Sequence, residues 1–137
     1  MTWEHFHHQA DIGIRGIGDS LEEAFEDGAV ALMAVICSPD KVQPQQTLEI
    51  ECEAPEKDLL FADWINALIY EMDIRKMLFS RFKIDIEKHK LIGKAWGEPF
   101  DYDRHEPAVE VKAATFMELK VIQNGQNQWI AQCVVDV

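Results

Sequence analysis

The sequence is poor in cationic side chains and contains no long apolar run. Its 137 residues include 13 Lys and Arg against 25 Asp and Glu, which gives a formal net charge of −12. Nucleic-acid affinity comes largely from cations that displace counterions from phosphates, so direct binding of RNA or DNA is not expected. The absence of roughly 18 consecutive apolar residues argues against a membrane protein. An acidic surface suits plain solubility, a bound cation or a basic protein partner.

The motifs of common metal and nucleotide sites are also missing. Cysteine occurs only at Cys37, Cys52 and Cys133, and these positions form no CxxC pair or zinc-binding spacing. Three reduced thiols in a cytoplasmic protein are the simplest interpretation, and the first residues show no signal-peptide pattern. There is no HExxH, EF-hand or GxSxG motif, and the glycines of residues 13–18 only loosely resemble a phosphate-binding loop.

No linker, repeat or low-complexity stretch divides the chain. The hydrophobic share of 47% and the charged share of 28% are close to the averages of globular domains. A chain of this length buries enough surface to fold without a disulfide or a structural metal. We therefore expect one domain over residues 1–137.

Two helices are predicted from apolar residues at helical spacing. The first follows Ser20, where Glu23 completes a capping-box pattern, and it ends before Ser38-Pro39-Asp40. The second begins after residues 55–58, and its wide apolar arc indicates that it is the more buried of the two. That arc consists of Leu60, Phe61, Trp64, Ile65, Leu68, Ile69 and Met72.

Alternation of apolar and polar residues predicts the strands. They cover residues 12–18, 47–53, 82–87, 109–121 and 129–137. The pattern as a whole is typical of an α+β fold, with a mostly antiparallel β-sheet and two α-helices packed against it.

The last two strands are predicted to form a hairpin. Asn124-Gly125 favours a two-residue type I′ turn. Counting outward from that turn places Phe116 opposite Cys133 and Lys112 opposite Val137.

The first candidate site consists of His7, His8 and Asp11. Imidazole and carboxylate together can bind a transition metal, whereas a carboxylate with main-chain oxygens can bind a hard cation. The alternative is that these residues merely cap the first strand.

The second candidate site lies at the other end of the sequence. Asp136 stands beside the terminal carboxylate of Val137, and two anions repel each other unless a cation or hydrogen-bond donors lie between them. The alternative is a frayed terminus, although strand-like residues up to Val137 favour a docked one. Lys112 is suited to orient a phosphate or carboxylate, or else to pair with an acid such as Glu110 on a neighbouring strand.

The third candidate combines Gly97-Glu98 with Asp101, Asp103 and His105. Paired carboxylates perform acid–base catalysis when the pKa of one of them is raised. The competing interpretation is a simple turn, which the glycine and the mixed charge favour.

Several short motifs, in their order along the whole chain, resemble the archease family. The resemblance rests on His8-Gln9-Ala10-Asp11-Ile12-Gly13-Ile14, Gly18-Asp19-Ser20-Leu21-Glu22-Glu23-Ala24-Phe25, Leu59-Leu60, Trp64-Ile65, Gly97-Glu98, Val111-Lys112-Ala113-Ala114-Thr115-Phe116 and Val135-Asp136-Val137. The family usually has Thr at the position of Gln9 and Tyr-His where Phe116-Met117 stand.

This resemblance implies a cytoplasmic protein cofactor of the RtcB-type tRNA-splicing RNA ligase, not an enzyme. The ligase joins RNA ends with GTP and a divalent metal, after guanylylation of its active-site histidine. The cofactor is expected to promote guanylylation and multiple turnover through a metal-binding tip. No membrane association is implied.

The family's metal ligands correspond to Asp11, Asp136 and an oxygen of Val137. The resemblance favours calcium as the bound cation, with magnesium or manganese as alternatives. His8, Glu98 and Lys112 are candidates to support these ligands or to contact the partner.

Two other functions compete with this expectation. One is a metal-dependent hydrolase that uses His8, Asp11 and Glu98, and it requires turnover without a partner. The other is a chaperone-like binding module with an incidental metal site, which would suppress aggregation of unrelated proteins.

Overall fold

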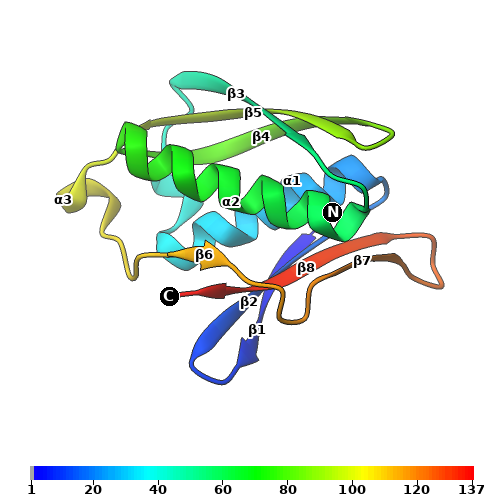
Figure 1. Cartoon of the computed structure of the whole chain (residues 1–137). Coiled ribbons are helices and arrows are strands. Elements are labelled where there is room, and N and C mark those ends of the chain that lie inside the picture. The colour runs from blue at the N-terminus through cyan, green and yellow to red at the C-terminus, as the bar shows by residue number, and fades with distance from the viewer. Residues whose placement is uncertain (1) are drawn as a thin grey trace.

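The computed structural model describes residues 2–137 as two antiparallel sheets with two long helices between them (Figure 1). The predicted α+β class, the antiparallel pairing and the two main helices are confirmed. The prediction of one sheet is wrong, because the strands divide between two. Each helix contacts strands of both sheets.

The larger sheet joins the two ends of the described chain. Its strands are β1 (Thr2–His8), β2 (Asp11–Gly18), β6 (Ala113–Ala114), β7 (Lys120–Gln123) and β8 (Trp129–Asp136). β2 lies between β1 and β8, and the other edge of β8 pairs with both β6 and β7. β8 is thus the central strand, with neighbours from both ends of the sequence.

The smaller sheet has the order β3-β5-β4. Its strands are β3 (Gln46–Glu53), β4 (Met77–Glu87) and β5 (Lys90–Pro99). β3 and most of β4 were predicted, whereas β5 was not. Gly97-Glu98 belongs to this strand, so the predicted turn at that position is wrong.

The helices begin close to where the sequence predicts. α1 (Leu21–Ile36) is capped by Ser20, whose Oγ accepts the Glu23 main-chain N–H at 3.1 Å. The Glu23 carboxylate accepts the main-chain N–H of Asp19 at 2.9 Å, so the Ser20 half of the predicted capping box is present and Glu23 bonds one residue before the N-cap instead of Ser20 itself. α2 (Lys57–Arg75) is followed much later by the short α3 (Tyr102–His105), and a 3-10 turn, η1 (Pro39–Lys41), follows α1.

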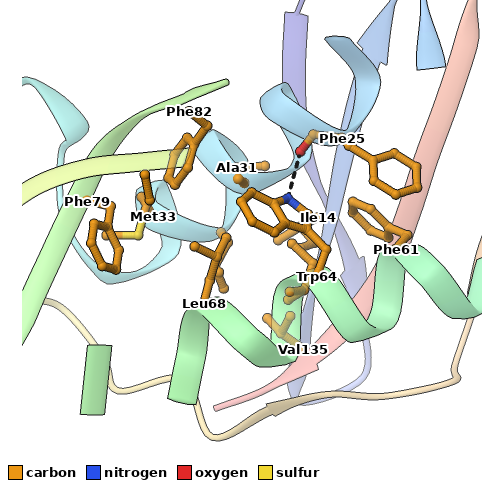
Figure 2. Close-up of a cluster of buried hydrophobic side chains, with 14 of the residues drawn as sticks. Ile14, Phe25, Ala31, Met33, Phe61, Trp64, Leu68, Phe79, Phe82 and Val135 are labelled. Carbon is orange, nitrogen blue, oxygen red and sulfur yellow. Dashed lines mark hydrogen bonds between the residues drawn. The ribbon is translucent and has the colours of Figure 1, made fainter. Parts of the chain in front are cut away.

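The core lies between the sheets and is built around both helices. Trp64 of α2 is fully buried, and its Nε1 donates to the main-chain oxygen of Phe25 in α1 at 3.2 Å (Figure 2). Its ring meets Phe82 of β4 edge-on, with 6.1 Å between ring centroids. One indole therefore joins both helices and the smaller sheet.

α1, not α2, is the more buried helix, which corrects the prediction. Nine of its 16 residues are buried, against six of the 19 residues of α2. Small residues explain the difference, because Gly28, Ala29 and Ala31 let α1 approach its neighbours closely. A Cβ on Gly16 of β2 would lie 2.1 Å from the main-chain oxygen of Ala24, so β2 and α1 touch through their backbones.

The strand predicted over residues 109–121 is interrupted. β6 pairs Ala113 with Asp136, and continuing this register places Lys112 opposite Val137, as predicted. β7 instead pairs Lys120 with Gln132, a shift of three residues that the intervening loop absorbs.

The hairpin turn also differs from the prediction. Asn124 N–H donates to the Gln128 oxygen at 2.8 Å, so residues 125–127 form a three-residue loop. The left-handed residue is Asn127, with φ 62°, and Gly125 has no positive φ. The Asn124 side chain accepts the N–H groups of Gln126 and Gln128, which fixes this loop in place of a type I′ turn.

Candidate functional site

Strand pairing brings the first and second candidate groups to one edge of the larger sheet. β2 pairs with β8 so that Ile12 lies opposite Val135, and one further step of this register places Asp11 opposite Asp136. Opposed residues on antiparallel strands have Cα atoms about 5 Å apart and side chains on the same face. Two carboxylates far apart in sequence are thus neighbours.

His8 belongs to the same cross-strand row. It pairs with Asp11 across the two-residue turn of Gln9 and Ala10, in which Gln9 has a left-handed φ of 54°. His7 precedes His8 in the strand and therefore points to the opposite face, so it is not part of the row. The Nδ1 atom of His8 is buried and has no hydrogen-bond partner in the described part of the chain.

The end of β8 is held on its other side by the segment before β6. Lys112 N–H donates to the main-chain oxygen of Asp136 at 2.8 Å. Asp136 is exposed, while Val137 is half-buried and packs against the core. The prediction of a docked end is confirmed, and the site is presented on an ordered strand.

The donor set fits a hard cation better than a transition metal. Among residues 2–137, no three His, Cys, Asp or Glu side chains converge as a metal site, so His8 does not complete such a site with Asp11 and Asp136. What remains is a pair of opposed carboxylates beside the main-chain oxygen of Val137. Oxygen ligands of this kind suit calcium, magnesium or manganese, and a cation between the carboxylates would offset their repulsion.

Glu98 is held by hydrogen bonds in a buried cluster. It is buried, and its carboxylate accepts hydrogen bonds from the Gln43 main-chain N–H at 2.6 Å and from the Arg104 guanidinium. His105 Nδ1 accepts the Asp101 N–H, which leaves Nε2 to donate to Glu98 at 3.1 Å. Burial alone would raise the pKa of Glu98, but these hydrogen bonds outweigh it and lower the pKa to about 2.

The third candidate group is therefore a structural cluster, not an acid–base pair. A general acid needs a raised pKa, and that of Glu98 is lowered. The Asp101 side chain caps α3 by accepting the N–H groups of Asp103 and Arg104. Each hydrogen bond to the Glu98 carboxylate comes from Gln43, Arg104 or His105, so Glu98 ties β5 to α3 and to the segment after η1. The roles of Gln43 and Arg104 were missed, because nothing in the sequence links residue 43 to residue 98.

Comparison with known proteins gives a match over nearly the whole chain. The model of the Archease protein family (MTH1598/TM1083) matches residues 3–137. The protein archease of Pyrococcus furiosus is 44% identical over 139 residues, which cover 98% of each chain. The protein archease of Sulfurisphaera tokodaii is 42% identical and covers 100% of this chain and 99% of its own.

Solved structures show the same fold. The solution structure of Methanobacterium thermoautotrophicum protein 1598 is 30% identical, with a TM-score of 0.87 over 98% of each chain. The 2.0 Å crystal structure of a Thermotoga maritima protein, described as an archease and possible chaperone, has a TM-score of 0.64 at 21% identity and covers 98% of this chain and 96% of its own. No helix within residues 2–137 is long and apolar enough to cross a membrane. The chain belongs to the archease family.

Proposed function

We propose that this protein is a cytoplasmic, non-catalytic activator of an RtcB-type tRNA-splicing RNA ligase. It promotes GTP-dependent guanylylation of the ligase and allows multiple turnover. Its functional site is a divalent cation bound by Asp11, Asp136 and the main-chain oxygen of Val137, and we call this edge of the larger sheet the cation end. Family membership supports the role, and the observation that carries the site is the β2–β8 register, which sets Asp11 opposite Asp136.

The chemistry of the site suits a helper protein. Asp11, Asp136 and Val137 would supply few oxygens to a cation, which would leave coordination positions open for phosphate oxygens of GTP or for side chains of the ligase. When bound, the cation supplies Lewis-acid neutralisation of phosphate charge. Asp11 and Asp136 would hold the cation at a fixed place, because β2 and β8 are paired strands in the middle of the sheet. Calcium is the proposed ion, with magnesium or manganese as alternatives.

The charge of the molecule supports a protein partner over direct RNA binding. A ligase cleft that accepts RNA must be basic, and a chain with a net charge of −12 is electrostatically complementary to it. Lys112, whose main-chain N–H donates to the Asp136 oxygen, lies beside the end of β8 and thus beside the proposed cation site. It is suited to meet a phosphate or a ligase carboxylate there.

The test is ligase guanylylation with GTP and metal held fixed. Wild type should accelerate it, and Asp136→Ala, which folds normally because Asp136 is exposed, should not. Asp85→Ala, at an exposed position on β4 in the smaller sheet, is the matched control and should act as wild type. Full stimulation by Asp136→Ala would refute the cation mechanism, and no stimulation by folded wild type would refute the proposed role.

The chaperone-like alternative is favoured only by the description of the Thermotoga maritima protein. It predicts that the protein suppresses aggregation of unrelated proteins, and that Asp11→Ala leaves this activity intact. The hydrolase alternative loses its support, since the pKa of Glu98 is lowered and its carboxylate is already occupied by hydrogen bonds.

A further inference from the structure

Exposed aromatic residues gather at the C-terminal end of α2. Tyr70 is 61% exposed and Tyr102 is 71% exposed, and Phe100 and Val109 beside them are also exposed. Together they line a cavity of about 910 Å³ between α2, α3 and residues 107–112, which we name the α2 groove. Figure 1 shows the segment after α3 passing this end of α2 on its way to β6.

The α2 groove is preformed by main-chain hydrogen bonds. Ala108 N–H donates to the Ile36 oxygen at 2.7 Å, and Phe100 N–H donates to the Lys76 oxygen at 2.8 Å. The Phe100 ring packs against His105, with 5.9 Å between ring centroids. The floor is apolar and is formed by the buried side chains of Ile36, Met77, Leu78 and Val111.

The chain leaves the aromatic side chains of this groove in water, although they would be buried if the groove were filled. Large exposed apolar clusters with a polar rim mark binding surfaces in soluble proteins. Aromatic residues around a preformed pocket are also the usual anchors of protein–protein interfaces. The exposed aromatic residues therefore indicate that the α2 groove is a binding surface.

The groove ends beside the proposed cation site. Lys112 lines it, and the main-chain N–H of Lys112 donates to the Asp136 oxygen at 2.8 Å. A protein that covers Asp136 is thus placed to continue over the groove.

The charges at the rim indicate what kind of segment fits. Of the charged residues that line the groove, Asp73 is paired with Lys76. Glu110 also lines the groove, is exposed and has no ion-pair partner within residues 2–137. Away from the Lys112 end, the unpaired charge of the rim is negative, which complements Lys or Arg in an occupant.

We propose that the α2 groove binds an apolar segment of the ligase, flanked by Lys or Arg, while the Asp11–Asp136 end reaches the ligase active site. This inference rests on the proposed function. The groove supplies affinity through burial of Tyr70, Phe100 and Tyr102, and the cation end supplies activation. The two parts have separable effects. The groove determines the protein concentration that gives half-maximal stimulation of the ligase, and the cation site determines the maximum stimulation.

The experiment titrates ligase guanylylation with wild type, Tyr102→Ser and Ile122→Ser. Tyr102→Ser should raise the half-maximal concentration about tenfold or more and leave the maximum unchanged. Ile122, an exposed residue of β7 that does not line the groove, is the control, and Ile122→Ser should follow the wild-type curve. Asp136→Ala should fail to stimulate guanylylation at any concentration, which distinguishes it from the groove variant.

Charge reversal tests the basic flank of the occupant. Glu110→Lys should raise the half-maximal concentration, and the effect should shrink at high salt. Glu49→Lys, on an exposed position of β3 in the smaller sheet, makes the same charge change away from the groove and should have no such effect.

Three results would overturn the inference. If wild type stimulates and Tyr102→Ser follows the same curve, the groove is not used, and the proposed function stands. If wild type is a dimer in light scattering and Tyr102→Ser is a monomer, the occupant is a second copy of this chain. If folded wild type does not stimulate the ligase, the inference and the proposed function fail together.

Discussion

Asp11 and Asp136 lie on opposite positions of paired strands, so two carboxylates share one face of the sheet without an intervening donor from the described side chains. Such a pair is destabilising when both are ionised. The proposed divalent cation would change the sign of this effect, because it would bind the folded chain and not the unfolded one. Cation binding should therefore appear as added stability.

Calcium added to the metal-free protein should raise its melting temperature. At a cation concentration 100 times the Kd, the expected gain in the free energy of unfolding is about 2.7 kcal/mol. Asp136→Asn should abolish the gain, and without cation it should be at least as stable as wild type, since the repulsion is gone. Asp85→Asn should keep the gain, and an equal gain in Asp136→Asn would contradict the assigned ligands.

Glu98 should make the free energy of unfolding depend on pH. Its pKa is lowered from 4.5 to about 2 in the fold, so as pH falls through this window the unfolded chain binds a proton that folded Glu98 does not. The free energy of unfolding therefore decreases from about pH 4.5 toward pH 2, and the contribution of Glu98 is fully present above that range. Denaturant titrations of Glu98→Gln should show a shallower decrease, and an unchanged slope would contradict the lowered pKa.

Removal of the carboxylate should also be costly at neutral pH. Glu98→Ala leaves the buried His105 and the Gln43 N–H without their acceptor, which should cost roughly 2 to 3 kcal/mol. Glu106→Ala removes an exposed carboxylate paired with Lys41 and should leave stability within the error of the measurement.

Single residues of the site were predicted unevenly. Spacing alone left Asp11 and Asp136 as separate candidates, because strand pairing between the two ends of a chain has no local signal. The family resemblance joined them, and the register brings them together. The sequence left Glu98 as a candidate acid with a simple turn as the favoured alternative, and its low pKa could not be predicted, since the hydrogen bond from Gln43 that helps to lower it comes from far away in the sequence.

Among the helices and strands, those with a clear local sequence pattern were predicted and those without one were missed. α1 was clear because Ser20 and Glu23 mark its start, and β3 was clear because its two faces differ in polarity. β1 was missed because most of its residues are exposed on both faces of an edge strand. β5 was missed because Gly93 and Gly97 break the pattern, at positions where Trp64 and the Leu78 backbone leave no room for a Cβ.

The contact between β2 and α1 gives a prediction for a pair of elements. Gly16→Ala places a methyl group 2.1 Å from the Ala24 oxygen, and backbone on both sides prevents relief, so it should cost roughly 3 kcal/mol or more. Gly125→Ala meets no atom within 4 Å and has no positive φ, so it should be neutral or slightly stabilising. Chemical denaturation of both variants is the measurement, and equal stabilities would contradict the backbone contact.

The interruption of the strand before β7 could not be predicted from the alternation of apolar and polar residues. Alternation continued through residues 109–121, but Thr115 Oγ1 donates to the Val134 oxygen and Met117 N–H donates to Thr115 Oγ1. Val134 still accepts the Thr115 main-chain N–H and donates its own N–H to the Met117 oxygen, so Phe116 between these two partners is the extra residue. Glu118 then takes a left-handed φ of 53°, and the register shifts before β7 begins.

For the whole molecule, a core shared by both sheets implies one cooperative unfolding transition. Trp64→Phe removes the hydrogen bond to Phe25 and leaves a small cavity, which should cost roughly 2 kcal/mol. Far-UV circular dichroism and the fluorescence of the remaining tryptophans, including Trp96 in the smaller sheet and Trp129 in the larger one, should shift together. Trp3→Phe, on the exposed edge strand, is the control, and separate transitions for the two probes would contradict a common core.

For the whole molecule, the acidic charge and the proposed cation site are the basis of the proposal that it acts on another protein. The net charge of −12 was readable from the sequence, and so were the α+β class and most of the elements. The division into two sheets and the α2 groove were not, because both depend on which segments lie side by side in space.

The most direct test of the central proposal is multiple-turnover RNA ligation with the ligase limiting and GTP and metal fixed. With wild type present, each ligase molecule should join many RNA ends. With Asp136→Ala at saturating concentration, ligation should stop near one product per ligase, because the ligase is not guanylylated again. Repeated turnover with Asp136→Ala at the wild-type rate would contradict activation through the Asp11–Asp136 end.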